Sequence, residues 1–293
     1  MGPRGVRLVL GFSPGSFSDR IARIISGPLA DALGRQVTIE LRPGHNGVPA
    51  ARDVAASAPD GKVLFMATLG THALAPNLVN GSPYDPLRDF TCVSLVAKSP
   101  MLLACSTTLA IGSTAELIAR ARADDYPLTY ATSAVGGAPH LAAELFQEMS
   151  GITLQHVRYD ETERLYVDLE AGAVAVSFNN LISMLPRCRR GSLRALAVSS
   201  ASRIAAAPDI PTLAESGLPG YEVTNWVGIV APPGMDPALL AELSKAVTAA
   251  VESDAVTSAL RVDGVVPCGG APEVFASFMA AELKRWRSIA ARL

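Results

Sequence analysis

The chain has 293 residues and a formal net charge of −2, with 49 % hydrophobic but only 5 % aromatic residues. This length allows one large or two medium domains with an ample core, and the abundance of Ala, Val and Leu suits helices packed on a parallel sheet. The sequence has no basic block, no acidic tail and no apolar run of about 18 residues, which argues against a nucleic-acid partner, an anionic membrane surface and a membrane-spanning helix.

The first predicted unit is a strand, a turn and a helix. Val6–Phe12 is an apolar run, Ser13–Ser18 is a turn, and from Asp19 the apolar residues recur at helical spacing as far as Gly34. Asp19 is expected to cap this helix. The start of such a helix presents free backbone N–H groups and the positive end of the helix dipole, which suits a carboxylate or a phosphate.

Two more strands are expected in the first half of the chain, at Val37–Leu41 and Val63–Ala67, with a helix at Ala50–Ala58 between them. The third strand leads into the hydroxyl-rich loop Thr68–His72. Open α/β sheets bind ligands at such strand ends, but the loop is equally suited to cap a helix over Ala73–Leu78. Both interpretations stay open.

The unit around which the chain is organised lies near its middle. Leu128–Ala131 is a short strand, Thr132–Gly137 is a small, polar, flexible turn, and a helical pattern starts at Ala138. The hydroxyls of Thr132 and Ser133 beside a helix N-terminus are suited to bind carboxylate oxygens. Two such anion sites, more than a hundred residues apart, indicate two lobes that serve one ligand. Spacing alone leaves open that both are ordinary turns of an α/β protein.

The remaining pattern repeats strand and helix. Ser113 is expected to cap a helix through Ala123, with Glu116 at the capping-box position. Further strands are expected at Leu154–Val157, Val174–Phe178, Leu193–Val198 and Val223–Val230, and helices end at Gly172, near Gly191 and, as a short one, at Gly217; Leu239–Val251 and Phe275–Trp286 mark two C-terminal helices. This alternation predicts an α/β fold with mainly parallel sheets.

Two crossings divide the chain into lobes. A strand at Phe90–Val96 leads to the first crossing and hinge at Met101–Cys105, and the second lies at Thr224–Val230, where Trp226 either packs in the hinge or lines the cleft. The expected lobes are 1–101 with 227–293, and 102–226.

No motif predicts a cofactor. The four cysteines, Cys92, Cys105, Cys188 and Cys268, form neither a C-x-x-C pair nor a zinc pattern, and a disulfide is unsupported. Walker A and Gly-x-Gly-x-x-Gly motifs are absent. Ser133 and His140 suggest a hydrolase as a rival, but Gly-x-Ser-x-Gly is absent around Ser133 and no acidic partner is identified for His140.

The residues of several motifs, and the order of these motifs along the chain, resemble those of the extracytoplasmic solute receptors of tripartite tricarboxylate transporters, the Bug receptor family of bacteria. The matching segments are Phe12–Asp19, Arg42–Gly47, Ala58–Gly61, Thr68–His72, Tyr84–Phe90, Tyr130–Ser133, Gly136–Leu141, Gly191–Val198 and Pro211–Gly217. Each is weak alone, but they span nearly the whole chain in the family's order.

The resemblance implies a periplasmic binding protein of the two-lobed type II fold, whose turns clamp a carboxylate-bearing solute in a cleft. By position, the lining residues of the first lobe would be Pro14, Gly15, Ser16, Phe17 and Thr68, and those of the second lobe Ser133, Gly136, Gly137 and His140, beside Thr132. Phe17 is a cleft-wall aromatic or a core-packed turn residue, and His140 is a ligand contact or a satisfied structural histidine.

Three departures from the family pattern bear on the ligand. Ser16 stands where a second glycine is usual, Asn179 stands where an Asp is common, and Asp160 and Glu161 replace a Lys-Gly pair. Asp160 near the cleft would repel a highly charged anion, which favours a monocarboxylate or an amine-bearing carboxylate over citrate.

The sequence therefore predicts a monomeric receptor, not an enzyme, that closes its lobes over a small mono- or dicarboxylate, amino acid or aromatic acid and delivers it to a membrane permease. A signalling receptor is the alternative with the same cleft. Met1–Leu8 has no hydrophobic signal region, so the chain is either cytoplasmic or, as the resemblance implies, a periplasmic protein whose targeting segment has been removed.

Overall fold

The computed structural model describes residues 5–78, 84–123, 127–133, 136–159 and 161–290. The chain divides into two compact units. Unit 1 comprises Met1–Lys98, Trp226–Arg261 and Val266–Leu293, and unit 2 comprises Ser99–Asn225 and Val262–Val265. The chain leaves unit 1 inside strand β4 (Thr91–Ser106) and returns inside strand β9 (Thr224–Ala231).

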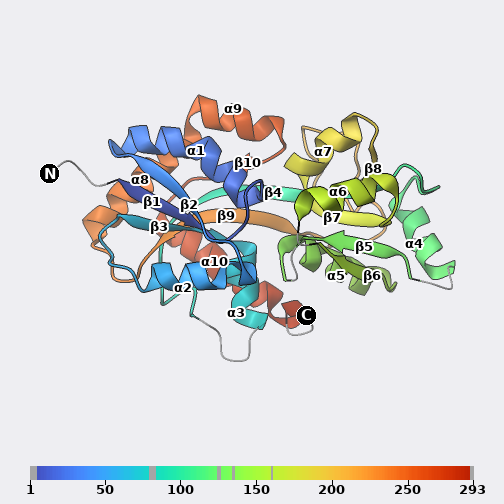
Figure 1. Ribbon diagram of the computed structural model, residues 1–293, viewed down its shortest axis with the longest axis horizontal. Coiled ribbons are helices and arrows are strands. Elements are labelled where there is room, and N and C mark those ends of the chain that lie inside the picture. Colours follow the sequence, from blue (N-terminus) through green and yellow to red (C-terminus); the bar gives the residue numbers. More distant parts are fainter. Residues whose placement is uncertain (1–4, 79–83, 124–126, 134–135, 160, 291–293) are drawn as a thin grey trace. The chain divides into compact units, whose positions relative to one another are not determined.

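Unit 1 is built on three parallel strands in the order β2-β1-β3, with β9 antiparallel to β3, β4 beyond it, and β10 antiparallel to β4. Helices cover both faces of this sheet, α1 and α9 on one side and α2 and α3 on the other (Figure 1). Its other elements are β1 (Val6–Leu10), α1 (Phe17–Leu33), β2 (Val37–Leu41), the 3-10 turn η1 (His45–Gly47), α2 (Val48–Ala55), β3 (Val63–Thr68), the π-helical turn η2 (Gly70–Leu74), α3 (Ala75–Leu78), α8 (Pro237–Glu252), α9 (Asp254–Val262), β10 (Val266–Pro267) and α10 (Pro272–Ala290).

Unit 2 repeats the arrangement. Its parallel strands have the order β6-β5-β7, and β4 is antiparallel to both β7 and β8. Its elements are α4 (Thr114–Ala123), β5 (Thr129–Thr132), α5 (Ala138–Ser150), β6 (Gln155–Arg158), α6 (Thr162–Ala171), β7 (Val176–Asn180), α7 (Leu181–Arg189) and β8 (Leu193–Val198). The expected two-lobed α/β class is confirmed, but each sheet is mixed, because the crossing strands run against the parallel ones.

In both units the first parallel strand lies between the second and the third. The chain therefore leaves β1, and likewise β5, toward one neighbour and later returns to the other side. In open α/β sheets with this strand order, ligands bind at the carboxyl end of the first strand. The turns that follow β1 and β5 occupy this point in their respective units.

The start of α1 differs from the prediction. Ser16, not Asp19, is the N-cap, because its Oγ accepts a hydrogen bond from the Asp19 backbone N–H at 3.3 Å. Asp19 lies in the first turn, where its carboxylate accepts from the Gly15 N–H at 2.8 Å. The prediction at α4 was right: Ser113 Oγ accepts from the Glu116 N–H at 3.1 Å.

Strand β4 is one continuous element, whereas the sequence predicts a strand at Phe90–Val96 and a separate crossing at Met101–Cys105. Ala97 and Lys98 pair with β10, and pairing with β7 begins at Met101. Pro100 therefore lies between two pairing partners, where its missing N–H leaves no ladder bond unmade. Two predictions in the C-terminal half of the chain were also wrong. The short helix expected before Gly217 is absent, because residues 213–217 form turns, and α9 was not predicted from the sequence.

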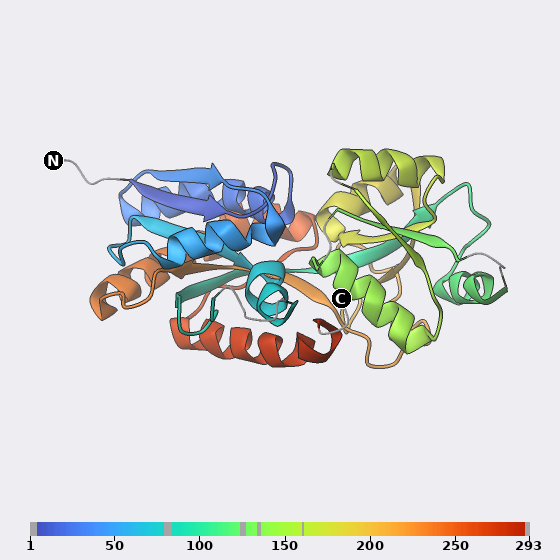
Figure 2. The same ribbon diagram turned by 60° about the horizontal axis from the view of Figure 1, so that its bottom comes forward.

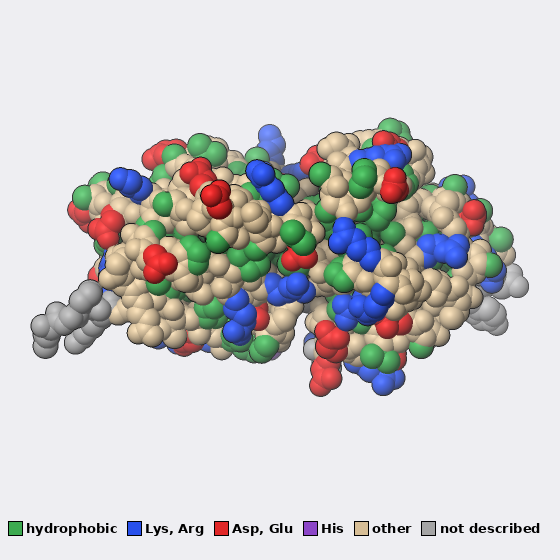
Figure 3. All heavy atoms as spheres, turned by 90° about the horizontal axis from the view of Figure 1, so that it is seen from above, with side chains coloured by type: hydrophobic (Ala, Val, Ile, Leu, Met, Phe, Trp, Pro, Cys, Tyr) green, Lys and Arg blue, Asp and Glu red, His purple; other side chains and the backbone are tan. Residues whose placement is uncertain are grey.

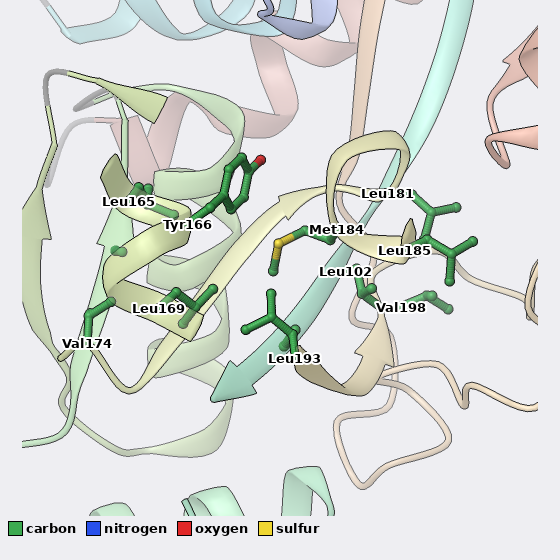
Figure 4. Close-up of a cluster of buried hydrophobic side chains, with 12 residues drawn as sticks. Leu102, Leu165, Tyr166, Leu169, Val174, Leu181, Met184, Leu185, Leu193 and Val198 are labelled. Carbon is green, nitrogen blue, oxygen red and sulfur yellow. The ribbon is translucent and has the colours of Figure 1, made fainter. Parts of the chain in front are cut away.

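The core of unit 2 is a cluster of aliphatic side chains between α6, α7 and the strands β4 and β8 (Figure 4). Cys188 packs against this cluster and, like the other three cysteines, carries a free thiol. Met184 and Leu169 are fully buried there and hold the two helices against the sheet.

Helix α10, seen along its length in Figure 2, anchors both crossing strands inside unit 1. The Trp226 indole N–H of β9 donates to Glu282 Oε2 at 3.0 Å, and Trp286 Nε1 donates to the same oxygen at 3.0 Å. The Lys98 ammonium of β4 lies 4.1 Å from the centre of the Phe278 ring. One buried carboxylate thus satisfies both tryptophans of the chain.

Candidate functional site

The turn after β1 presents donors of the first turn of α1. Pro14 and Gly15 are exposed, and Gly15 adopts a left-handed backbone with φ of +78°. The Ser16 hydroxyl lies 3.3 Å from Ser18 Oγ and caps the helix, so it is already engaged. Phe17 is 7 % exposed and packs into the core. In the described part of the chain no acceptor is found for the N–H groups of Phe17 and Ser18, which leaves two donors for an anion.

The loops after β1, β2 and β3 meet at the same end of the sheet. A Cβ added at Gly11 would lie 2.4 Å from Gly47 Cα, and one added at Gly47 would lie 3.0 Å from Thr71 Cγ2. Between Gly44 and Gly47, His45 and Asn46 have positive φ values of 45° and 54°, a left-handed backbone that asparagine tolerates and that is uncommon for most other residues with a side chain. The sequence signal for this loop, the glycines Gly44 and Gly47 on either side of His45 and Asn46, did not predict its place beside the site.

Thr68 has the hydrogen bonds of a helix cap. Its Oγ1 accepts from the Thr71 N–H at 3.1 Å, while Thr71 Oγ1 accepts from the Thr68 N–H at 3.0 Å. Thr68 is 6 % exposed. Its hydroxyl is therefore engaged with Thr71 at the start of η2, beside the Gly47 loop, and its contact with a ligand stays a prediction.

His72 is a core residue of unit 1. It is fully buried, its Nδ1 lies 2.9 Å from Thr71 Oγ1, and its ring packs against Phe65, Tyr84 and Phe90 at centroid distances of 4.6 to 5.8 Å. Burial lowers the pKa of His72 to about 3. The imidazole is therefore neutral over the whole physiological range.

The turn after β5 presents a second set of donors. Gly137 precedes α5 without any side-chain cap, and the N–H groups of Ala138 and His140 find no acceptor among the residues that the structure describes. Ser133, half-buried, stands at the strand end, whereas Thr132 is fully buried with its Oγ1 2.7 Å from His156 Nε2. Ala134 and Val135 lie outside the described residues.

His140 faces inward. Its Nδ1 accepts from the Gly136 N–H at 3.0 Å, and its Nε2 lies 3.6 Å from Glu144 Oε1. The expectation that His140 has no acidic partner was wrong, because Glu144 follows one helical turn later. Since Gly136 and Glu144 occupy the two ring nitrogens, the arrangement of a Ser133–His140 nucleophile and base is not formed.

The rings of His140, His156 and Tyr130 form a stack beside the turn that follows β5. His140 lies 4.5 Å from His156, and His156 lies 4.7 Å from Tyr130, as centroid distances, with interplanar angles of 15° and 17°. Burial, with a smaller contribution from His156, lowers the pKa of His140 to about 4 despite Glu144. Burial is also the main cause that lowers the pKa of His156.

Asn179 lies at the end of β7, next to this turn. The pairing of Ala131 with Ser177 places Asn179 beside Ser133 two residues further along. Asn179 is 4 % exposed; its Oδ1 accepts from the Asn180 N–H at 2.9 Å, while its Nδ2 finds no acceptor within the described ranges. Asp160 lies outside the described residues.

The histidines His72, His140 and His156, of which the first two are buried and the third is half-buried, predict an acid-dependent stability. Because each pKa is lowered in the folded chain, the unfolded chain binds more protons below pH 6.5, and the free energy of unfolding falls as the pH drops from about 6.5 toward 3. His72 alone accounts for about 2 kcal/mol between pH 7 and pH 5. Urea unfolding at several pH values measures this slope.

His72→Phe, which fits the surrounding aromatic rings, is expected to flatten the slope. His45→Asn is the matched control, because His45 is exposed and Asn tolerates its backbone. An unchanged slope in His72→Phe contradicts the assignment.

The described residues contain no group of three or more His, Cys, Asp or Glu side chains suited to a metal ion. Where the structure describes the chain, none of its helices has both the length and the apolar character needed to cross a bilayer. On the face shown in Figure 3, Lys and Arg side chains are interspersed with Asp and Glu on each unit.

The model of the "Tripartite tricarboxylate transporter family receptor" family, TctC, matches residues 21–293. "Protein BugT" of Bordetella pertussis is 33 % identical over 287 residues, covering 98 % of this chain and 88 % of that protein. A protein from the tcbD-tcbE intergenic region of a Pseudomonas species is 32 % identical, covering 98 % and 85 %.

Solved structures agree. Rpa4515 of R. palustris with adipate has a TM-score of 0.92 at 36 % identity, covering 99 % of this chain and 97 % of that one. MatC of Rhodopseudomonas palustris with bound malate has a TM-score of 0.90 at 29 % identity, covering 99 % and 100 %. The periplasmic binding protein BugD gives 0.90 at 25 %, covering 99 % and 97 %. This chain belongs to the tripartite tricarboxylate transporter receptor family, the TctC or Bug solute-binding receptors.

Proposed function

We propose that this protein captures a small carboxylate-bearing solute in the periplasm by closing its two units over it, and then delivers it to a tripartite tricarboxylate-type permease. The observation that carries the proposal is that both units have the same strand order, with the first parallel strand between the second and the third. Each unit ends its first parallel strand in a turn, followed by a helix whose first N–H groups have no acceptor in the described chain. Two such donor sets match the two carboxylates of a dicarboxylate.

The residues proposed to line the site are those of the two turns and their neighbours. In unit 1 these are Pro14, Gly15, Ser16, Phe17 and Thr68, and in unit 2 Thr132, Ser133, Gly136, Gly137, His140, Asp160 and Asn179. Backbone N–H groups and hydroxyls make the direct contacts, while the engaged side chains of Ser16, Thr68, Thr132 and His140 shape the turns. The Nδ2 group of Asn179 adds a donor at the end of β7.

The ligand class follows from this donor set. Neutral N–H and hydroxyl donors bind carboxylates without a fixed counter-charge, and Asp160 opposes a third negative charge. We therefore expect linear mono- and dicarboxylates to bind better than citrate. Adipate and malate, bound in two related structures, are the first compounds to test. Amino acids and aromatic acids complete the panel.

The test is a thermal-shift screen with these acids. Any ligand that binds the folded state raises the melting temperature in a dose-dependent way. The uncharged diamide of adipate is the compound control, because it keeps the chain length and loses both charges. The proposal is contradicted if no carboxylate raises the melting temperature, or if adipate and its diamide raise it equally.

A backbone variant tests the donors directly. Ala138→Pro removes one N–H at the first position of α5, where proline is well tolerated and Gly137 already has the extended backbone that precedes proline. We expect adipate affinity to fall by about 10-fold or more, since hydrogen bonds to charged groups contribute about 1.5–3 kcal/mol. Calorimetric titration measures the loss. An unchanged affinity contradicts the role of this helix start.

A further inference from the structure

The contact between Gly136 and His140 fixes the chemical state of the histidine. A backbone N–H only donates, so His140 Nδ1, 3.0 Å from the Gly136 nitrogen, must accept with its lone pair. The ring is therefore neutral and carries its proton on Nε2. This tautomer follows from the donor's identity and not from a choice between two ring orientations.

The surroundings of His140 support this tautomer. Glu144 Oε1, on the same helix, lies 3.6 Å from Nε2 and also accepts from the Tyr130 hydroxyl of β5 at 2.7 Å. From β6, His156 stacks on the ring, and the positive charge of Arg158 contributes, after burial, to lowering the pKa of His156. A carboxylate at Nε2 keeps the proton on that nitrogen and leaves Nδ1 free to accept.

Gly136 is the residue through which His140 acts. It has a left-handed backbone with φ of +70° and lies one residue before Gly137, which opens α5. The N–H groups of Ala138 and His140, for which the described residues offer no acceptor, follow directly. Anchoring the Gly136 N–H thus sets the direction in which the chain enters the helix and aims the next donors.

We propose that His140 is a positioning residue of the solute site: its Nδ1 lone pair holds the Gly136 N–H and thereby the turn whose donors bind the solute carboxylate. The inference deepens the proposed function and rests on it for its effect on affinity. A proton on Nδ1 would set two donors against each other and release the turn. Solute affinity therefore depends on an unprotonated acceptor at this one position.

Three substitutions separate the acceptor from the ring. His140→Asn places an amide oxygen where Nδ1 stands, His140→Gln reaches the position of Nε2, and His140→Phe keeps the ring without an acceptor. With adipate as the probe at pH 7, we expect His140→Asn to stay within about threefold of the unmodified chain, and the other two to lose about 10-fold, the cost of one unmade hydrogen bond. Circular dichroism and melting temperature check that each variant folds.

The pH dependence adds a readout that a merely structural role does not move. Because burial lowers the pKa of His140 to about 4, the unmodified chain should lose affinity as the pH falls from 6 toward 4, while His140→Asn has no proton to gain there. The ratio of the two affinities cancels the protonation of adipate itself and of every group whose pKa is the same in both variants. That ratio should move in favour of His140→Asn by about twofold at pH 4, where about half of the His140 rings are protonated, and a constant ratio overturns the inference.

A ligand-free measurement keeps this inference distinct from the proposed function. Amide hydrogen exchange at Gly136 should be slow in the unmodified chain and in His140→Asn and at least 10-fold faster in His140→Phe. If adipate binds no variant while this exchange pattern holds, the positioning role stands and the proposed function falls. Equal exchange rates in all variants overturn the inference, whatever adipate does.

Discussion

Gly11→Ala is expected to destabilise unit 1 by about 3 kcal/mol or more, because the new methyl group has nowhere to go. Its Cβ would lie 2.4 Å from Gly47 Cα, so the obstacle is backbone. Gly47 has a φ of +77°, and a Cβ built on Gly47 would lie only 3.0 Å from Thr71 Cγ2. The backbone at Gly47 is therefore packed against η2 and cannot move toward it. The β1 and β2 loops would have to separate. The donors of the adjoining α1 turn would move with them, and adipate affinity should fall in parallel.

Gly27→Ala is the matched control for this substitution. Gly27 lies exposed in α1, and a Cβ there meets nothing within 4 Å. Its stability should stay within about 1 kcal/mol of the unmodified chain or rise slightly. Urea unfolding followed by tryptophan fluorescence suits both variants, because Trp226 and Trp286 both belong to unit 1. Equal stability of the two variants would show that the Gly11–Gly47 contact is looser than described.

The second large effect is expected at Glu282. Glu282→Leu removes the acceptor of two buried indole N–H groups, each bonded at 3.0 Å to the same Oε2 atom. A buried donor left without a partner costs about 1–3 kcal/mol, so the loss should reach about 3–5 kcal/mol for the pair. The tryptophan emission spectrum should shift as well, because both fluorophores lose the same negative neighbour.

Two comparisons identify the cause of that loss. Glu282→Gln keeps a carbonyl oxygen and should cost much less. In the background of Trp286→Phe, which has no indole N–H, Glu282→Leu should cost about 1–3 kcal/mol less than it does alone. Additive effects of Glu282→Leu and Trp286→Phe would mean that the shared hydrogen bonds do not carry the stability.

Local signals predicted much of the fold correctly. The run from Ile21 to Leu33 and the stop at Gly34 have a helix's spacing and a helix's end, and Gly34 indeed has the left-handed backbone of a C-cap. Ser113 with Glu116 predicted the start of α4 for the same reason. Near Asp19 two residues suited to cap a helix stand three apart, and periodicity cannot choose between them. Ser16 is the N-cap, because the helix already begins at the buried Phe17.

The rest needed contacts that no local pattern carries. Lys98-Ser99-Pro100 has the composition of a loop, yet it continues a strand because its pairing partner changes there. The two turns that follow β1 and β5 were predicted as anion sites from their own residues. Their common place in the strand order is a property of the sheet. That His140 turns its Nδ1 to Gly136 depends on Tyr130 and His156, which come from two other elements.

The two interruptions of unit 1 have a consequence for how the chain acquires its structure. Strands β1, β2 and β3 leave the ribosome first, but β3 pairs with β9. The pairing of Phe65 with Val230 therefore forms only after most of the chain has been made. Unit 2 is almost continuous in sequence and has all its strands before that point. It is therefore the part suited to close its core first, whereas β3 remains an open apolar edge until the C-terminal segment arrives. During synthesis, that edge is where we expect a chaperone to be needed most.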